Sequence, residues 1–142
     1  MGQPSSSNAR RWMVVVLDVA GGWSGAAYGS ITLHTRPVPA APGGVSAQWN
    51  NGFAGGGSIR GYFNGSSWAT SYEFGGNFNF NGSLSGWTST VRSSSGYAIV
   101  ANCSAGTTMT GGQFRVRAGN SSGWSGYVTV GASKNTSIPA CN

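Results

Sequence analysis

The stretch that decides the fold runs from residue 56 to residue 87, where GGSIRGYFNGSSW (residues 56–68) is followed by GGNFNFNGSLSGW (residues 75–87). Each copy begins with a Gly pair, alternates between apolar and polar residues, and reaches an Asn-Gly turn before a Trp. The Gly pairs and the Trp residues are each 19 residues apart, and the Asn-Gly turns are 17 apart. Asn-Gly supplies the two positive-φ residues of a type I′ turn, so each copy predicts a β-hairpin and the two together predict a meander.

The rest of the chain shows the same period-two alternation, with Gly or Asn-Gly between the segments, which is typical of antiparallel sandwiches and barrels. The predicted strands are Trp12–Val19, Ser30–Thr35, Val45–Trp49, Ser58–Phe63, Ser67–Phe74, Asn77–Phe80, Trp87–Val91, Tyr97–Asn102, Gln113–Ala118 and Tyr127–Ala132. No helical stripe competes with them. We therefore predict an all-β fold, an antiparallel β-sandwich of the jelly-roll-like kind with about 8 to 10 short strands.

Composition excludes the other fold classes. Gly, Ser, Asn and Thr make up nearly half of the 142 residues, and only ten residues are charged, eight basic and two acidic. Soluble helices need a charged face and strong helix formers, so a helix bundle is excluded. Six Trp, five Tyr and six Phe argue against disorder, which goes with few aromatic residues. The length fits one domain over residues 1–142.

The small number of acidic, His and Cys residues also limits which catalytic sites the chain can form. A glycosidase would have to pair Asp18 with Glu73, because no other pair of acidic side chains exists. A catalytic triad would need His34, and a zinc site would need His34 with Cys103, Cys141 and a carboxylate, at spacings that suggest no metal. We expect a protein that is not an enzyme and that uses no cofactor or metal.

The two ends of the chain lie outside the predicted strands. Residues 1–11 are expected to form an extended N-terminal arm and residues 133–142 a C-terminal tail. Arg10, Arg11 and the apolar run that follows resemble a secretory signal, but Asp18 interrupts the run and no small-x-small cleavage site follows. The run is also too short to cross a bilayer, so we interpret it as a strand and expect no membrane span.

Residues 37–44 (PVPAAPGG) contain three Pro and two Gly, which predicts an extended connector that cannot occupy the middle of a sheet. Such a connector either crosses between the sheets or runs over a neighbouring molecule. The arm and the connector are the predicted assembly contacts, with Arg10, Arg11, Trp12, Pro37, Pro39 and Pro42 as the contact residues.

Cys103 and Cys141 allow two interpretations. A disulfide between them would tie the C-terminal tail to the sheet and contribute about 3 to 4 kcal/mol by loop-closure entropy. Two cysteines are also an ordinary number for unpaired thiols in a core. The spacing alone leaves both alternatives open, and the tail itself could pack on its own domain or on a neighbour.

Aromatic residues next to amides suggest a carbohydrate site, because sugars bind flat rings with polar groups at the rim. The candidate ligand-binding residues are Trp49, Asn50, Trp68, Trp87 and Trp124. A second repeat joins Gly22-Trp23-Ser24-Gly25 to Gly123-Trp124-Ser125-Gly126, and it could present two exposed Trp platforms. The alternative is that a Trp in a tight Gly turn simply covers the end of the sandwich. Exposed aromatics also leave binding to a membrane surface as a weaker hypothesis.

The net charge of +6 raises the question of nucleic acid. Phosphate binding normally needs a clustered basic patch, whereas here only Arg115 and Arg117 are placed by alternation on one face of a strand. We therefore expect no nucleic-acid partner, unless the inner face of a coat touches a genome.

A structural subunit is the function that the composition favours. Uncharged polar surfaces lose less on desolvation than Lys or Glu, which suits a protein largely buried against its neighbours. The hypothesis is a non-enzymatic protein of a virus or phage particle, as a capsid, decoration, fibre or spike subunit. Its expected partners are copies of itself and other virion proteins, and its expected location is the virion, assembled inside the host cell. The alternative is a lectin-like or receptor-binding module that takes a host-surface glycan.

Overall fold

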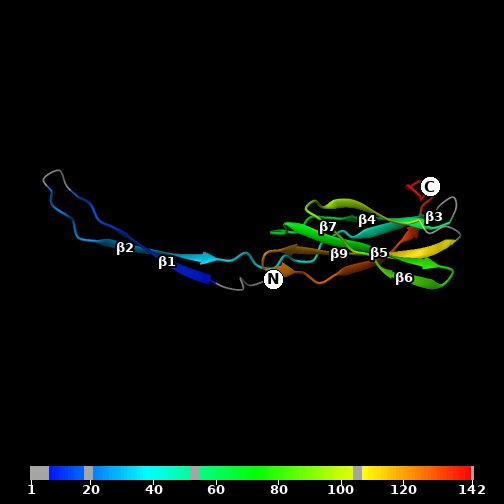
Figure 1. Ribbon diagram of the computed structural model, residues 1–142, viewed down its shortest axis with the longest axis horizontal. Coiled ribbons are helices and arrows are strands. Elements are labelled where there is room, and N and C mark those ends of the chain that lie inside the picture. The colour runs from blue at the N-terminus through cyan, green and yellow to red at the C-terminus, as the bar shows by residue number, and fades with distance from the viewer. Residues whose placement is uncertain (1–6, 18–20, 52–54, 104–106, 142) are drawn as a thin grey trace.

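The computed structural model describes residues 7–17, 21–51, 55–103 and 107–141. They form twelve strands and no helix: β1 (Ser7–Val14), β2 (Ala27–His34), β3 (Ser46–Asn51), β4 (Gly57–Phe63), β5 (Ser71–Phe80), β6 (Ser83–Trp87), β7 (Thr90–Arg92), β8 (Gly96–Asn102), β9 (Met109–Asn120), β10 (Gly123–Trp124), β11 (Val128–Gly131) and β12 (Ser133–Lys134). Strands β3 to β12 make a sandwich, and β1 with β2 makes a hairpin that extends beyond one end of it (Figure 1).

Two sheets form the sandwich. One has the order β12-β3-β4-β8, and the other places β9 and β5 in its middle, with β10 and β11 along β9 and with β6 and β7 along β5. All pairs are antiparallel except the short parallel contact of β12 with β3. The predicted antiparallel β-sandwich is therefore confirmed, and its ten strands match the expected number.

The two copies of the central repeat differ in structure. Asn81 and Gly82 have φ values of 51° and 90° and join β5 to β6, so the second copy forms the predicted hairpin. The prediction is wrong for the first copy, because β4 pairs with β3 and β8 and never with β5. Its Asn-Gly turn instead leads the chain from one sheet to the other, and the Asn64 N–H donates to the carbonyl oxygen of Gly43 at 2.9 Å.

Aromatic rings from both sheets fill the space between them. Phe63 of β4 lies 5.2 Å from Tyr72 and 6.4 Å from both Phe74 and Phe114, measured between ring centroids. The Phe114 ring lies directly over Gly61, where any Cβ would meet its outer carbons. The fully buried side chains Ile59, Phe78, Met109 and Val116 complete the core.

The strands predicted at Trp12–Val19 and Ser30–Thr35 do not join the sandwich, which corrects the sequence prediction. Strands β1 and β2 pair with each other from Ser7↔His34 to Val14↔Ala27, and Leu17 forms a bridge with Trp23 nearer the tip. We call this hairpin, residues 7–34, the arm. The predicted arm of residues 1–11 was thus too short, while residues 1–6 lie outside the described part of the chain.

The connector packs on its own domain. Pro37, Pro39 and Pro42 are buried, so the prediction that they contact neighbouring molecules is wrong. Asn120 Nδ2 donates to the carbonyl oxygen of Pro37 at 2.8 Å, and Ser122 Oγ donates to that of Arg36. The base of the arm is therefore fixed to the turn between β9 and β10.

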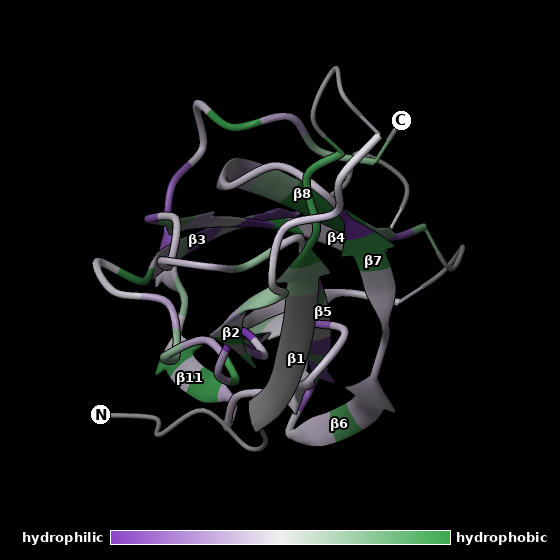
Figure 2. Ribbon diagram, turned by 90° about the vertical axis from the view of Figure 1, so that its left-hand side faces the viewer, coloured by the Kyte–Doolittle hydropathy of each residue, from purple (hydrophilic) through white to green (hydrophobic). Residues whose placement is uncertain are grey.

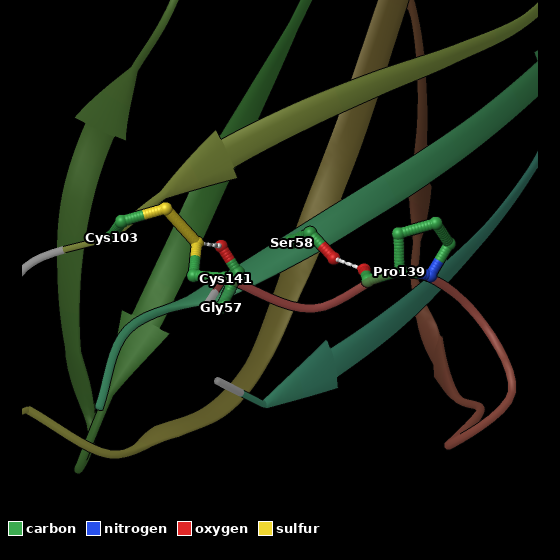
Figure 3. Close-up of a disulfide and its surroundings, with 5 residues drawn as sticks. All are labelled: Gly57, Ser58, Cys103, Pro139 and Cys141. Carbon is green, nitrogen blue, oxygen red and sulfur yellow. Dashed lines mark hydrogen bonds between the residues drawn. A yellow bond between two sulfur atoms is a disulfide. The ribbon is translucent and has the colours of Figure 1, made fainter. Parts of the chain in front are cut away.

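The C-terminal tail also packs on its own domain (Figure 3). A disulfide joins Cys103 to Cys141 with the Cα atoms 5.3 Å apart, so the structure shows the bridge rather than free thiols. Ser58 Oγ donates to the carbonyl oxygen of Pro139, and Asn50 Nδ2 donates to that of Ile138 at 2.8 Å. These contacts hold the tail along β3 and β4.

Candidate functional site

Arginine and aromatic side chains alternate on the outer face of the sheet that contains β9. The Arg115 guanidinium lies 4.6 Å from the Trp87 ring and 4.2 Å from the Tyr127 ring. The Arg117 guanidinium lies 4.5 Å from Tyr127 and 4.9 Å from Trp124. The two arginines thus share a face, as alternation predicts, and the five side chains form a continuous row of cation–π contacts. We call them the cation–aromatic row.

Glu73 anchors this row from the neighbouring strand β5. Its carboxylate accepts from Arg117 Nε at 2.7 Å and from Ser89 Oγ at 2.5 Å. The Ser89 hydrogen bond and then the Arg117 contact lower the pKa of Glu73 below its ordinary value, and partial burial opposes them. Burial, followed by the hydrogen bond to Glu73, raises the pKa of Tyr127. Ser89 and Arg117 therefore favour the ionised form of Glu73.

Acidification is expected to weaken this contact. A carboxyl group whose pKa is lowered by folding stabilises the protein above its unfolded pKa, near 4, and loses that contribution as the pH falls through the folded value. Glu73→Gln should lower the free energy of unfolding by about 1 kcal/mol at pH 7 and by progressively less below about pH 4. Urea unfolding of both proteins between pH 7 and pH 2.5 measures the gap, and a gap that stays constant with pH would contradict the prediction.

The predicted sugar platforms lie in different surroundings. Trp49 belongs to the core with Lys134 Nζ 5.5 Å from its ring, and the side-chain amide of Asn50 holds the tail, so neither offers a free binding face. Trp87 and Trp124 both lie in the cation–aromatic row, where an arginine covers one face of each ring. Trp68 remains 55% exposed in the turn before β5.

The two copies of the Trp-Ser-Gly repeat share one arrangement of serine hydrogen bonds, which also occurs at Ser85 between β5 and β6. Ser24 Oγ accepts from the Val16 N–H at 2.9 Å, and Ser125 Oγ accepts from the Ala118 N–H at 3.0 Å. In both, the serine also donates to the carbonyl oxygen of the glycine that follows it. The sequence repeat indicated the similarity, but not that the serine carries it.

The two tryptophans of this repeat lie in different surroundings. Trp124 packs against Gly119 and beneath Arg117. It therefore covers part of the sheet, which agrees with the alternative that a Trp in a tight Gly turn covers the end of the sandwich. Trp23 faces Leu17 across the arm, where Leu17 takes the position that Gly119 has opposite Trp124, and Trp23 is 69% exposed. Trp124 is thus packed against the sheet with 38% of its surface exposed, whereas Trp23 is largely exposed.

The arm carries most of the exposed apolar surface. Of the sixteen large hydrophobic residues exposed in the described part of the chain, nine lie on it: Met13, Val14, Val15, Val16, Leu17, Trp23, Tyr28, Ile31 and Leu33. The register places Met13 and Tyr28 on one face and Val14 with Ile31 and Leu33 on the other. Both faces of the arm therefore carry exposed apolar side chains. In Figure 2 the end of β1 and the segment after it have the green of apolar residues.

The other residues singled out from the sequence do not come together. His34 is exposed at the end of β2, Glu73 lies on the sandwich, and Asp18 falls outside the described residues. Arg10, Arg11 and Trp12 lie on β1 of the arm. Within the described ranges, no three acidic, His or Cys side chains are grouped as metal ligands, and no helix could cross a membrane.

The comparisons with known proteins concern the fold. No protein-family model and no curated protein matches the sequence. Among solved structures, the chain is similar to that titled "Crystal Structure of FN3tt", with 23% identity, 71% of this chain and 99% of that chain covered, and a TM-score of 0.47. It is also similar to "Structure of FN3tt mut", with 21% identity, 69% and 99% covered, and a TM-score of 0.46.

Proposed function

We propose that the protein is a non-enzymatic structural subunit of a virus particle, most simply of a phage, which assembles with copies of itself and with other virion proteins through its arm. The observation that carries the proposal is the arm: nine exposed large hydrophobic residues on a hairpin that extends away from the sandwich. Monomeric soluble proteins rarely expose so much continuous apolar surface unless a partner covers it.

The size of this surface fits a stable contact. Covering a half-exposed aliphatic or aromatic side chain contributes about 1 kcal/mol, so nine of them supply on the order of 10 kcal/mol before the cost of association. The sandwich itself supports the same function, because its surface is poor in charge and its tail is tied by a disulfide. Disulfides persist in oxidising surroundings, which fits a particle released from the cell.

Charging the arm is expected to abolish assembly. In the variant Val14→Asp/Val16→Asp, two exposed side chains change, so the sandwich should fold normally while the apolar contact is lost. Sedimentation velocity from 1 to 200 μM should show concentration-dependent oligomers for the unmodified protein and at least 100-fold weaker association for the variant.

Leu84→Asp, at an equally exposed position on β6, is the matched control and should assemble normally. A monomeric unmodified protein across this range would overturn the proposal. Electron microscopy of the native material tests the virion itself, because the proposal requires the protein to be found in regular particles.

A second candidate function, binding of a host-surface glycan, rests on Trp68. This residue is 55% exposed, and none of the cation–π contacts found in the described part of the chain involves its ring. A glycan array read with Trp68→Ala beside the unmodified protein tests this candidate. Binding that survives the substitution would place any sugar elsewhere.

A further inference from the structure

We propose that the arm of one copy adds to the outer edge of β8 in a second copy and so extends the sheet β12-β3-β4-β8 by two strands. The inference rests on the proposed self-assembly and names the surface that receives the arm. Addition of a strand to an exposed sheet edge is a common way in which one chain recognises another.

Strand β8 is the edge most open to pairing. It is seven residues long, contains no charge and no proline, and no described strand pairs with its outer side. Natural proteins protect sheet edges by keeping them short or charged. The other edge strands of the sandwich are shorter than β8: β6 has five residues, β11 has four, β7 has three and ends in Arg92, β10 has two, and β12 has two and includes Lys134.

One contact already lies at the beginning of this edge. Arg92 Nη1 donates to the carbonyl oxygen of Tyr97 at 2.7 Å. The contact comes from a side chain and covers one carbonyl group, so it leaves the stretch from Ala98 to Ala101 to be paired. The arm is expected to dock along that stretch.

The side chains of β8 and the arm match on both faces. On β8, Ala98 and Val100 point into the core, while Tyr97, Ile99 and Ala101 are exposed on the outer face. Paired strands place their side chains next to each other on the same face, and apolar neighbours stabilise the pair. A strand that is apolar on both faces suits this edge, and residues 13–17 of the arm, MVVVL, have that pattern.

The arm also needs a further strand. A two-stranded hairpin is at best marginally stable in water, whereas three strands with an apolar face are stable. A lipid surface would not meet this need, because the backbone groups at the two free edges of the hairpin would remain unpaired in hydrocarbon. A protein edge satisfies both the backbone groups and the apolar side chains.

The receiving edge belongs to another copy rather than to the same chain. Asn120 and Ser122 hold the residues at the base of the arm, and the arm extends away from the sandwich that carries its own β8 (Figure 1). Donor and acceptor are different surfaces, so the contact is head-to-tail, and successive copies close into a ring or grow into a filament.

The test uses a charge on the receiving edge. Ile99 is 43% exposed, so Ile99→Lys should leave the fold intact and weaken association at least 30-fold in sedimentation velocity. Val91→Lys is the matched control, since Val91 is 56% exposed on the edge strand β7, and it should associate as the unmodified protein does. Thermal unfolding of both variants checks that the sandwich is unchanged.

Mixing distinguishes the proposed edge from other contacts. Val14→Asp/Val16→Asp keeps an intact β8 and Ile99→Lys keeps an intact arm, so each alone should be monomeric and an equimolar mixture should form 1:1 dimers. Hydrogen exchange should slow along β8 of the arm variant in that mixture. Normal assembly of Ile99→Lys, with loss of assembly only on charging the arm, would overturn this inference and leave the proposed function standing. Normal assembly of the arm variant would overturn both.

Discussion

Replacing both Cys103 and Cys141 by serine is expected to lower the free energy of unfolding by about 4 kcal/mol. The two residues are 38 positions apart, and a crosslink that closes a loop of this size restricts the unfolded chain by about that amount. Changing both avoids a free thiol. Chemical denaturation with and without reductant measures the effect: the reductant should reproduce the loss in the unmodified protein and should not change the serine variant.

The C-terminal tail should be the first part of the protein to lose stability when the disulfide is removed. Without the bridge, residues 135–141 are held to β3 and β4 by a few hydrogen bonds, chiefly those of Asn50 and Ser58. Amide exchange should therefore speed up in the tail and along β3 at denaturant concentrations that leave β5 and β9 protected. A serine variant within 1 kcal/mol of the unmodified protein would show that the packed tail supplies the stability without the crosslink.

Gly75→Ala is expected to destabilise the sandwich by about 3 kcal/mol. A Cβ on Gly75 would collide with the carbonyl oxygen of Thr88 and would lie 2.7 Å from its carbonyl carbon. The obstacle is backbone, held in place because the Thr88 N–H donates to the Gly76 carbonyl oxygen at 3.0 Å. It cannot move aside without shifting Trp87, the first member of the cation–aromatic row.

Two measurements separate this effect from a general cost of replacing glycine. Gly131→Ala, on the edge strand β11, meets no atom within 4 Å and should change the unfolding free energy by less than about 0.5 kcal/mol. The near-ultraviolet circular dichroism of the tryptophans should change for Gly75→Ala and not for Gly131→Ala. Equal stability of the two variants would mean that Thr88 moves freely.

The local pattern of the sequence predicted the strands well but not their partners. Asn64-Gly65 and Asn81-Gly82 are the same dipeptide in similar surroundings, yet only the second closes a hairpin. The difference lies in β4, whose partners β3 and β8 are brought to it by the rest of the fold. A turn motif determines which backbone conformation is accessible locally. Contacts with strands that are distant in the sequence determine whether the two strands on either side of the turn pair with each other.

Local sequence patterns likewise did not show which side chains would surround Arg115 and Arg117 or whether residues 13–17 would be exposed. Alternation placed Arg115 and Arg117 on one face, but the rings that cover them come from separate segments, among them Trp87. The run MVVVL at residues 13–17 is too short to cross a bilayer, and from the sequence it is therefore assigned to one of the strands of the sandwich. Its exposure became visible only with the structure, as did the buried prolines of the connector.

The attachment of the arm decides how a mechanical load would enter the domain. Tension on the arm reaches the sandwich at the carbonyl groups of residues 36 and 37, which Asn120 and Ser122 hold at the end of β9. Strand β9 is paired with β5 along most of its length and with β11 on its other side, so a pull along it shears many hydrogen bonds together instead of opening them one at a time. The point of attachment thus transfers strain to the most extensively paired strand of the sandwich.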